Sequence, residues 1–359
     1  MRIYFDRYFY KSNSASAILL KRRIQIDNET FGNKDYLVFS TTKNYKGTSS
    51  DEIEHDSKEL IQYGRIRFTS MLKLYIGFFL FYNKNSNQIT SITSQSSPGF
   101  NLFYFSLLPW RKKVLYIIQD VYPDGIMKTL NLLWLLPFIK PILKICYSRI
   151  NYLQTISSDM QKYLLHTYGV KPKITYNPNP YPTDLRTKVL DENEIKIGYS
   201  GNFSNSHGYH GPKNLLDCLI QLDNRLLIEI RGFGKYYDQF NLIYKETPIR
   251  FGGPMKSKEY LEYIESLDVI LLFQEDDYQK YCLSCKFNSS IEFNKPIIYV
   301  GPICDITRYI TSQNIGLCLS PQNSKGEILE QLNYFFENLH VFVENAQNNK
   351  AFQLDEYFK

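Results

Sequence analysis

From Ile195 onward the sequence alternates between short apolar runs and amphipathic runs, and this alternation constrains the fold more than any other feature. The run DVILLF at 268–273 is almost wholly apolar, which is typical of a strand buried on both faces. The run SKEYLEYIESL at 257–267 carries apolar residues at helical spacing behind Ser257, a residue type that caps helices well. Strands that alternate with helices in this way predict a parallel sheet covered by helices on both faces.

The first half of the chain shows the same pattern less regularly. Five of its runs are typical of strands: MRIYFD, DYLVFS, QITSIT, KVLYII and NYLQTI. The run KPKITYNPNPYPTDL at 171–185 holds four prolines, which exclude a helix or a central strand and indicate a connector. The sequence therefore predicts two doubly wound, Rossmann-like α/β domains, 1–180 and 181–345, that face a central cleft. Residues 346–359 are expected to form a helix that packs back on the first domain.

Composition narrows the class of protein. Apolar residues make up 43% of the 359 residues and charged residues 22%, which is typical of a globular protein. The formal net charge of +6 falls well short of a nucleic-acid-binding protein, and no basic-aromatic motif of that kind occurs. No run suits a signal peptide or is long enough to span a bilayer, so a cytoplasmic protein is expected.

Motifs that would indicate other chemistry are missing from the sequence. A lone CxxC, Cys282 to Cys285, has no second pair, which disfavours a zinc or redox site. The run GFG at 232–234 has Tyr237 where a dinucleotide fingerprint has its third glycine. No Walker lysine, nucleophile elbow, HExxH or Asp-x-Asp motif occurs. A nicotinamide enzyme is therefore disfavoured, and neither a cofactor nor a metal is expected.

Turn glycines and polar residues follow the expected strands of the second half. They are Gly201 and Asn202, Gly232 and Gly234, Gly252 and Gly253, Gln274, and Gly301. Ligands of open parallel sheets bind outside the carboxyl ends of the strands, where helix N-termini supply amide donors suited to a diphosphate. Any one of these glycines is explained by the turn alone, but several in one domain favour a backbone that a ligand approaches closely.

A lysine, Lys286, stands near the start of a short polar helix in the run CLSCKFNSSIEFNKPIIYVG. It is either a solvated surface charge, the usual case, or a cation directed at phosphate. The run KFNSSIEFNKPII resembles the helix-to-strand segment of family 4 glycosyltransferases of the GT-B fold, with Lys286 and Lys295-Pro296 at the family spacing. Further segments resemble that family in order along the chain: TSQSSPG, IIQDVYPDGI, TISSDMQKYLLHTYGV, TYNPNP, SGN, GPKNLL, RGFG and SLDVILL. The resemblance extends from about Gln88 to Pro321.

The resemblance implies a glycosyltransferase whose donor substrate is a nucleotide-diphosphate sugar. Lys286 and Lys213 would bind the donor diphosphate and stabilise the leaving nucleoside diphosphate without a metal. The anomeric configuration would be retained. Asp120 would position or deprotonate the acceptor hydroxyl, and Asp124 would either face the cleft or only cap a helix.

The sequence departs from the family where a glutamate normally binds the donor ribose. Ser289 holds that position, and Tyr281 holds the position of a second glutamate upstream. Ribose binding is left to Ser289, Ser290 or Glu292, and Asn202 stands where many relatives have arginine. The predicted donor-binding residues are Gly201, Asn202, Gly232, Phe233, Gly234, Ser284, Ser289, Ser290 and Glu292.

The acceptor implied by the resemblance is a glycan on a polyprenyl-diphosphate carrier, in the synthesis of a bacterial capsule, O-antigen or exopolysaccharide. The run MLKLYIGFFLFY at 71–82 is either a core helix or a surface for the inner face of the cytoplasmic membrane. The basic runs KRR at 21–23 and RKK at 111–113 would support that surface. Two other functions stay open: an inactive relative that serves as a partner or scaffold, and a nucleotide-sugar epimerase of the same architecture.

Overall fold

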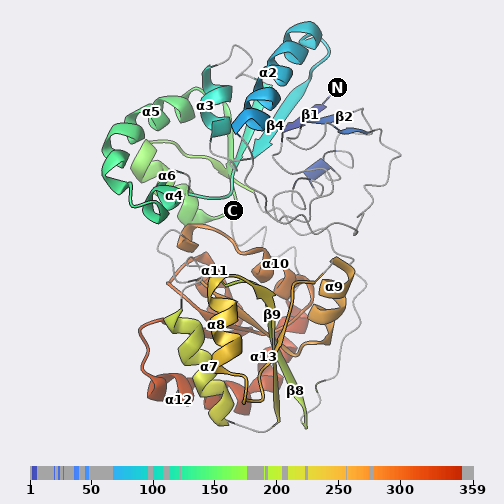
Figure 1. Ribbon diagram of the computed structural model, residues 1–359, viewed down its shortest axis with the longest axis vertical. Helices are drawn as coiled ribbons and strands as arrows, with labels where there is room; N and C mark the ends of the chain where they lie inside the picture. Colours follow the sequence, from blue (N-terminus) through green and yellow to red (C-terminus); the bar gives the residue numbers. More distant parts are fainter. Residues whose placement is uncertain are drawn as a thin grey trace. The chain divides into compact units, whose positions relative to one another are not determined.

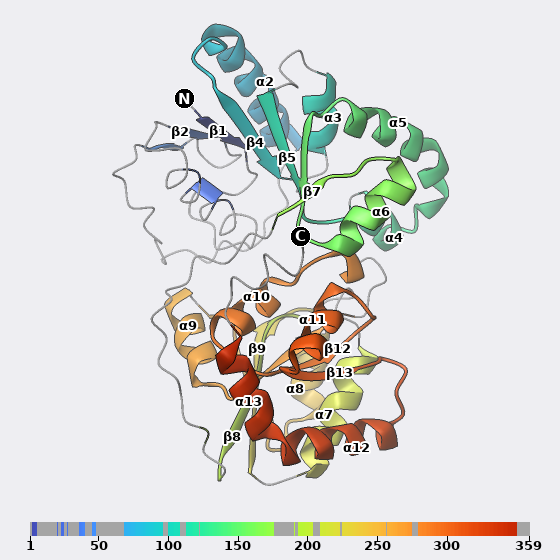
Figure 2. The ribbon, with the colours of Figure 1, turned by 180° about the vertical axis from the view of Figure 1, so that it is seen from behind.

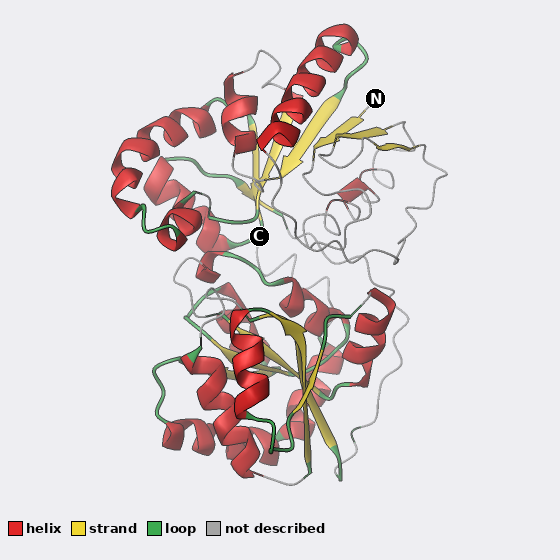
Figure 3. Cartoon of the chain, in the orientation of Figure 1, coloured by secondary structure: helices red, strands yellow, loops and turns green. Residues whose placement is uncertain are grey.

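The chain divides into two compact units, one comprising Met1–Pro180 and the other beginning at Tyr181. Helices and strands alternate along both units (Figure 3). The computed structural model describes residues 2–5, 20, 23–24, 27, 36–39, 45–47, 68–95, 100–107, 113–121, 123–175, 190, 193–203, 209–222, 225–255, 257–274 and 279–349.

The first unit is built on a sheet with the strand order β3-β2-β1-β4-β5-β6-β7 (Figure 1). Neighbouring strands are parallel from β2 to β7, and β3 pairs with β2 in the antiparallel sense. The strands are β1 Arg2–Phe5, β2 Tyr36–Phe39, β3 Tyr45–Gly47, β4 Ser91–Gln95, β5 Val114–Ile118, β6 Tyr152–Thr155 and β7 Lys173–Ile174. The described helices are α2 Phe68–Asn85, α3 Phe100–Leu107, α4 Asp124–Thr129, η2 Leu133–Leu135, α5 Leu136–Ser148 and α6 Ser158–Tyr168.

Aromatic side chains build the core between β1 and the helices α2 and α3. The Phe5 ring lies 5.6 Å from Tyr75 and 5.6 Å from Phe78 of α2, measured between ring centroids. On α3, Tyr104 and Phe105 lie 6.4 and 5.3 Å from the same ring. Part of the high aromatic content therefore fills this core, with the offset and edge-to-face pairs that aromatic rings prefer.

The second unit is built on a parallel sheet with the strand order β10-β9-β8-β11-β12-β13 (Figure 2). The strands are β8 Ile195–Asn202, β9 Leu226–Phe233, β10 Arg250–Gly252, β11 Val269–Phe273, β12 Ile297–Val300 and β13 Gly316–Leu319. The described helices are α7 His210–Leu222, α8 Lys235–Ile243, α9 Ser257–Ser266, η4 Gln279–Tyr281, α10 Cys285–Glu292, α11 Asp305–Gln313, α12 Lys325–Glu337 and α13 Leu339–Asn348.

Strand β11 confirms that this sheet is covered on both faces. Leu271 and Phe273 join the main core, which also contains buried residues of α7, α8 and α12. Ile270 instead joins a separate core with Tyr263 and Ile264 of α9. Successive side chains of a strand point to opposite faces, so a strand between two cores must be apolar throughout. The predicted doubly wound parallel sheets are therefore confirmed.

Some predictions differ from the structure. The prediction missed α8, whose sequence KYYDQFNLI is rich in tyrosine and phenylalanine and has weak helical propensity. The predicted strand QITSIT is shifted, since β4 begins only at Ser91. The helix predicted for 346–359 overlaps α13 only at 346–348, because α13 ends at Asn348. Residues 350–359 lie outside the described residues. No helix in the described ranges has the length and hydropathy that a membrane span requires.

Candidate functional site

The strand order of the second unit creates a topological switch point between β8 and β11. From β8 the chain proceeds outward through β9 and β10, and it then returns to place β11 on the other side of β8. Open α/β sheets bind ligands at such points, outside the carboxyl ends of the two strands. Here β8 ends at Asn202 and β11 ends at Phe273, so the residues that follow these positions define the candidate site.

The Lys286 side chain extends across this switch point, from the helix that follows β11 to the end of β8. It is the second residue of α10, whose N-cap Ser284 accepts a hydrogen bond at Oγ from the Lys286 backbone N–H (3.3 Å). The ammonium Nζ lies 5.2 Å from the centroid of the Tyr199 ring in β8, within the range of a cation–π contact. A Cβ built on Gly201 would overlap the Lys286 Cε. A cation carried by the first turn of the helix after β11 therefore lies over the end of β8.

The predicted glycines of β9 have a structural reason that the sequence did not reveal. A Cβ on Gly232 would overlap the Gly201 carbonyl oxygen, and a Cβ on Gly234 would overlap Asn202 Oδ1 and lie 2.6 Å from the Phe203 carbonyl oxygen. Gly234 also has φ +120°, a conformation that L side chains rarely adopt. Close pairing of β8 with β9 thus requires these glycines, whether or not a ligand approaches them.

Phe233 lies between these two glycines and is the residue of β9 that the turn exposes. Its side chain is 43% exposed, although it is an aromatic residue at the end of a sheet strand. The carbonyl oxygen of Phe233 accepts a hydrogen bond from the Phe203 N–H at 2.8 Å, which holds the two strand ends together. An exposed ring at the carboxyl edge is suited to stack against a flat ligand group such as a nucleobase.

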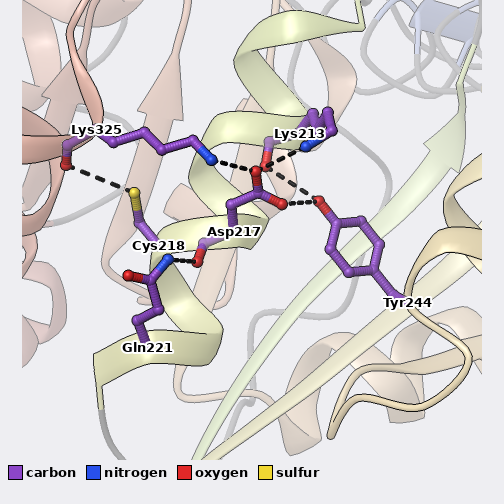
Figure 4. Close-up of polar contacts among 6 residues, drawn as sticks. All are labelled: Lys213, Asp217, Cys218, Gln221, Tyr244 and Lys325. Carbon is purple, nitrogen blue, oxygen red and sulfur yellow. Dashed lines mark hydrogen bonds and ion pairs between the residues drawn. The ribbon is translucent and has the colours of Figure 1, made fainter.

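Lys213 lies in the first turns of α7, where its charge is already paired. Its Nζ is 2.7 Å from Oδ2 of Asp217, one turn further along α7 (Figure 4). The same carboxylate oxygen lies 2.7 Å from Lys325 Nζ at the start of α12. Its Oδ1 accepts a hydrogen bond from the Tyr244 hydroxyl at 2.7 Å, next to the end of α8. Asp217 thus links three helices, and Lys213 would have to leave this pair to bind a diphosphate.

The two lysines and Tyr244 determine the protonation of Asp217. Burial raises the pKa of the Asp217 carboxyl, but hydrogen bonds from Lys213, Lys325 and Tyr244 outweigh burial and lower this pKa to about 2. The hydrogen bond from Lys325 to the carboxylate raises the pKa of the Lys325 ammonium in return. The Asp217 carboxyl group is therefore ionised at neutral pH.

The serines predicted to bind ribose are buried and hydrogen-bonded within the second unit. Ser289 Oγ accepts a hydrogen bond from the Tyr260 hydroxyl of α9 at 3.1 Å. Ser290 Oγ donates to the Lys286 carbonyl oxygen at 2.9 Å, one turn back along α10. Glu292, the last residue of α10, is half-buried. The structure therefore does not place the Ser289 and Ser290 side chains at the exposed edge with Lys286.

In the first unit, the two predicted aspartates differ in environment. Asp120 is exposed and follows β5 by two residues, so it lies at the carboxyl edge of the sheet. Asp124 is fully buried at the start of α4. Its Oδ2 accepts a hydrogen bond from the Tyr168 hydroxyl (2.9 Å), and its Oδ1 lies 3.7 Å from Lys140 Nζ. These contacts favour the structural role for Asp124, the alternative that the sequence left open.

Gln95, the last residue of β4, is a candidate that the sequence analysis missed. Its side chain is fully buried, and within the described part of the chain neither amide atom has a hydrogen-bond partner. Its place between β1 and β5 puts it at the switch point of the first sheet. A buried amide without a partner is costly, so this position suits a ligand hydroxyl or a water. Its only sequence signal is a polar residue at a strand end.

A separate hollow of about 880 Å³ lies at the carboxyl ends of β12 and β13, against α11. Gly301 and Arg308 line it, and neither Lys286 nor Phe233 does. Within the described ranges, no group of three or more His, Cys, Asp or Glu side chains could hold a metal ion.

Comparisons with known proteins identify the fold. No family model and no curated protein sequence matches this chain. Among solved structures, WaaG, a glycosyltransferase involved in lipopolysaccharide biosynthesis, is 12% identical, with 98% of this chain and 95% of that chain covered and a TM-score of 0.62. HepE of Anabaena, solved in complex with UDP-glucose, is 11% identical, with 99% and 97% covered and a TM-score of 0.64. Sucrose-phosphate synthase of Thermosynechococcus elongatus is 12% identical, with 100% and 94% covered and a TM-score of 0.66. The chain has the GT-B fold.

Proposed function

We propose that the chain is a glycosyltransferase of bacterial surface-polysaccharide synthesis. It transfers a sugar from a nucleoside-diphosphate sugar to a glycan acceptor on a polyprenyl-diphosphate carrier. Two proteins with the same fold support this proposal, because WaaG is involved in lipopolysaccharide biosynthesis and HepE was solved with UDP-glucose. In this proposal the second unit binds the donor and the first unit binds the acceptor at the inner face of the cytoplasmic membrane.

The position of Lys286 is the observation that carries the proposal. Its ammonium reaches from the first turn of α10 to Gly201 at the end of β8, so that a cation and helix-terminal amides lie together at a topological switch point. Such a place suits a diphosphate. The exposed Phe233 ring at the end of the neighbouring strand would hold the nucleobase.

The chemistry follows from where charge develops during transfer. Breaking the bond between the anomeric carbon and the donor phosphate leaves negative charge on the departing nucleoside diphosphate. Lys286 and the amides of α10 stabilise that charge without a metal, and Lys213 contributes when it leaves Asp217. The departing phosphate accepts the proton of the acceptor hydroxyl, so the configuration is retained, and Asp120 positions that hydroxyl.

The first test measures the unfolding temperature of the purified protein with UDP, GDP, ADP and CMP. A ligand at about 100 times its dissociation constant stabilises the folded state by roughly 2.7 kcal/mol. We expect one diphosphate to stabilise the protein and Lys286→Ala to abolish the shift. Lys245→Ala removes an exposed lysine just beyond the C-terminal end of α8, away from the carboxyl edge, and should leave the shift unchanged.

Equal stabilisation of the wild type and Lys286→Ala would contradict the role of Lys286. No shift with any nucleotide would instead favour the inactive scaffold. One observation favours that second candidate, since Ser289 is buried against Tyr260 at the position where the family that the sequence resembles carries a glutamate. An epimerase would convert a free nucleotide sugar without an acceptor, so product analysis of that reaction separates it from a transferase.

A further inference from the structure

The segment 133–149, which contains η2 and α5, presents an apolar stripe to solvent. Four large side chains in it are more than half exposed: Trp134 (65%), Phe138 (70%), Ile142 (51%) and Ile145 (56%). Their spacing of four, four and three residues places them on one side of the helix. Contiguous exposed apolar groups mark a surface that meets an apolar partner, whereas single exposed ones are common. These four residues are called the α5 stripe below.

The opposite side of α5 is firmly packed, so the stripe is not the result of a loosely attached helix. Leu136, Leu143, Cys146 and Tyr147 are buried. The helix contacts both α3 and α6. Both faces of α5 are therefore apolar, but only one has a partner within the described part of the chain.

The segment 125–175, which contains the stripe, is strongly basic in sequence. The basic residues of 125–175 are Lys128, Lys140, Lys144, Arg149, Lys162, Lys171 and Lys173, and the one acidic residue is Asp159. The whole chain has 42 basic and 36 acidic residues, so the remainder of the chain has 35 of each. The net charge of 125–175 therefore equals that of the whole chain, although Lys140 is paired with Asp124 just before this segment. Lys144 and Arg149 are exposed within or just after α5.

We propose that the α5 stripe and its basic residues bind the surface of an anionic lipid bilayer. An apolar stripe with tryptophan at one end and lysines at its margin is the pattern of a helix that lies in the membrane interface. The apolar side chains enter the boundary between headgroups and acyl chains. The long stems of Lys144 and Arg149 allow their charged ends to reach the anionic headgroups. This inference rests on the membrane location in the proposed function and assigns it to named residues, but its test does not require glycosyltransferase activity.

A second copy of the chain is a poorer occupant of the stripe. In a two-fold symmetric contact, each copy would present the same surface to the other. Lys144 and Arg149 of both copies would then face one another beside the contact, with no exposed acidic residue in the described range 123–175 to compensate them. An anionic surface has the complementary charge.

Helix α2, which the sequence left open as either a core helix or a membrane surface, is the rival within this unit. It buries Leu74, Phe78 and Tyr82, which confirms the core role, and exposes Ile76, Phe79 and Leu80, so its role as a membrane surface stays a prediction.

The described basic residues expected to support α2 are used inside the unit. Arg23 Nε lies 2.9 Å from Asp27 Oδ1. Lys113 Nζ donates to the carbonyl oxygens of Ser86 and Ile89, each at 3.1 Å. The other residues of these two basic runs lie outside the described residues.

The test is flotation of the full chain with vesicles of phosphatidylcholine, with and without phosphatidylglycerol. We expect the wild type to float with the anionic vesicles and to remain at the bottom with the neutral ones. The variant Trp134→Ser/Phe138→Ser/Ile142→Ser should bind about tenfold or more weakly, because three apolar side chains no longer leave water. The matched control Leu242→Ser/Ile243→Ser changes exposed apolar residues of α8 and should bind as the wild type does.

The outcomes separate the proposal from its rivals. A wild type that does not float, or that floats equally well with neutral vesicles, would overturn it. So would loss of binding in Ile76→Ser/Phe79→Ser/Leu80→Ser together with full binding by the α5 variant. Sedimentation of the wild type without lipid tests whether a second copy of the chain occupies the stripe. A dimer that forms in the wild type but not in the α5 variant would assign the stripe to self-association.

A spectroscopic measurement keeps the test valid if the triple variant folds poorly. The chain has two tryptophans, so Trp110→Phe leaves Trp134 as the single reporter. On addition of anionic vesicles, the Trp134 emission should shift to shorter wavelength and be quenched by brominated lipid. Emission that is unchanged at vesicle concentrations that float the protein would show that another surface binds.

Discussion

At Gly234, a single methyl group is enough to disturb the candidate site. The residue caps α8 with φ +120°, and a Cβ there would meet the Asn202 side chain and the Phe203 backbone. Neither the positive φ nor the fixed carbonyl of Phe203 can relax easily, because β8 and β9 are paired up to this point. The predicted glycine turn is therefore required by the sheet itself.

Gly234→Ala should lower the free energy of unfolding by roughly 2–4 kcal/mol, the combined cost of overpacking and an unfavourable backbone conformation. Gly253→Ala is the matched control, since an added Cβ there has nothing within 4 Å and the change should be nearly neutral. Urea unfolding of the two variants measures both values. Equal stability of the two would refute the close contact described for Gly234.

At the scale of helices, Asp217 connects elements that are far apart in the chain. Its carboxylate binds Lys213 on its own helix, Lys325 at the start of α12 and Tyr244 beyond α8. Tyr244 is buried, and its hydroxyl also donates to the Lys213 carbonyl oxygen at 3.1 Å. The network fixes the start of α7, the helix that carries the second lysine of the proposed donor site.

The network should make stability depend on pH in the acidic range. The pKa of Asp217 is about 2 in the folded chain and 3.8 in the reference state, so its contribution is complete above pH 4 and is lost as pH falls from about 4 to about 2. Asp217→Asn removes that contribution. We expect the stability difference between wild type and variant to be larger at pH 6 than at pH 3, as measured by urea unfolding. A difference that grows as pH falls would contradict the lowered pKa.

At the scale of the whole molecule, the distribution of charge matters more than its sum. A net charge of +6 spread over 359 residues would indicate little. In 125–175, the segment that contains the α5 stripe, seven basic residues and one acidic residue produce a field that falls off with the Debye length.

This distribution of charge predicts that added salt weakens the binding of the chain to anionic vesicles. Added salt should weaken nucleotide binding less. The Debye length falls from about 10 Å at 0.1 M salt to about 3 Å at 1 M, which screens a bilayer from charges that remain outside it. We expect flotation with anionic vesicles to weaken about tenfold or more over this range. Stabilisation by the nucleotide, measured in the same buffers, serves as the control that the chain stays folded. Flotation that does not change with salt would exclude the electrostatic part of the proposal.

How far the sequence predicts this molecule differs from feature to feature. The apolar run of β11 and the lysine at the start of α10 could be read directly, because burial on two faces and a helix start leave local signals. The ion pair between Asp217 and Lys325 could not be predicted, because 108 residues separate the two and only the packing of α7 on α12 brings them together. The α5 stripe was also hidden. The run LWLLPFIKPILKICY at 133–147 has apolar residues on both sides of η2 and α5, and only the structure shows which side is covered.

The positive charge of one segment has a consequence for how the chain would meet the acceptor proposed above. A molecule charged on one segment approaches an anionic leaflet with that segment first, so its orientation is set before any side chain enters the lipid. A chain held in this way diffuses in two dimensions, in the same thin layer as any acceptor carried on a lipid. Confinement would raise the effective concentration of the chain and the proposed acceptor, so that a weak intrinsic affinity between them would suffice.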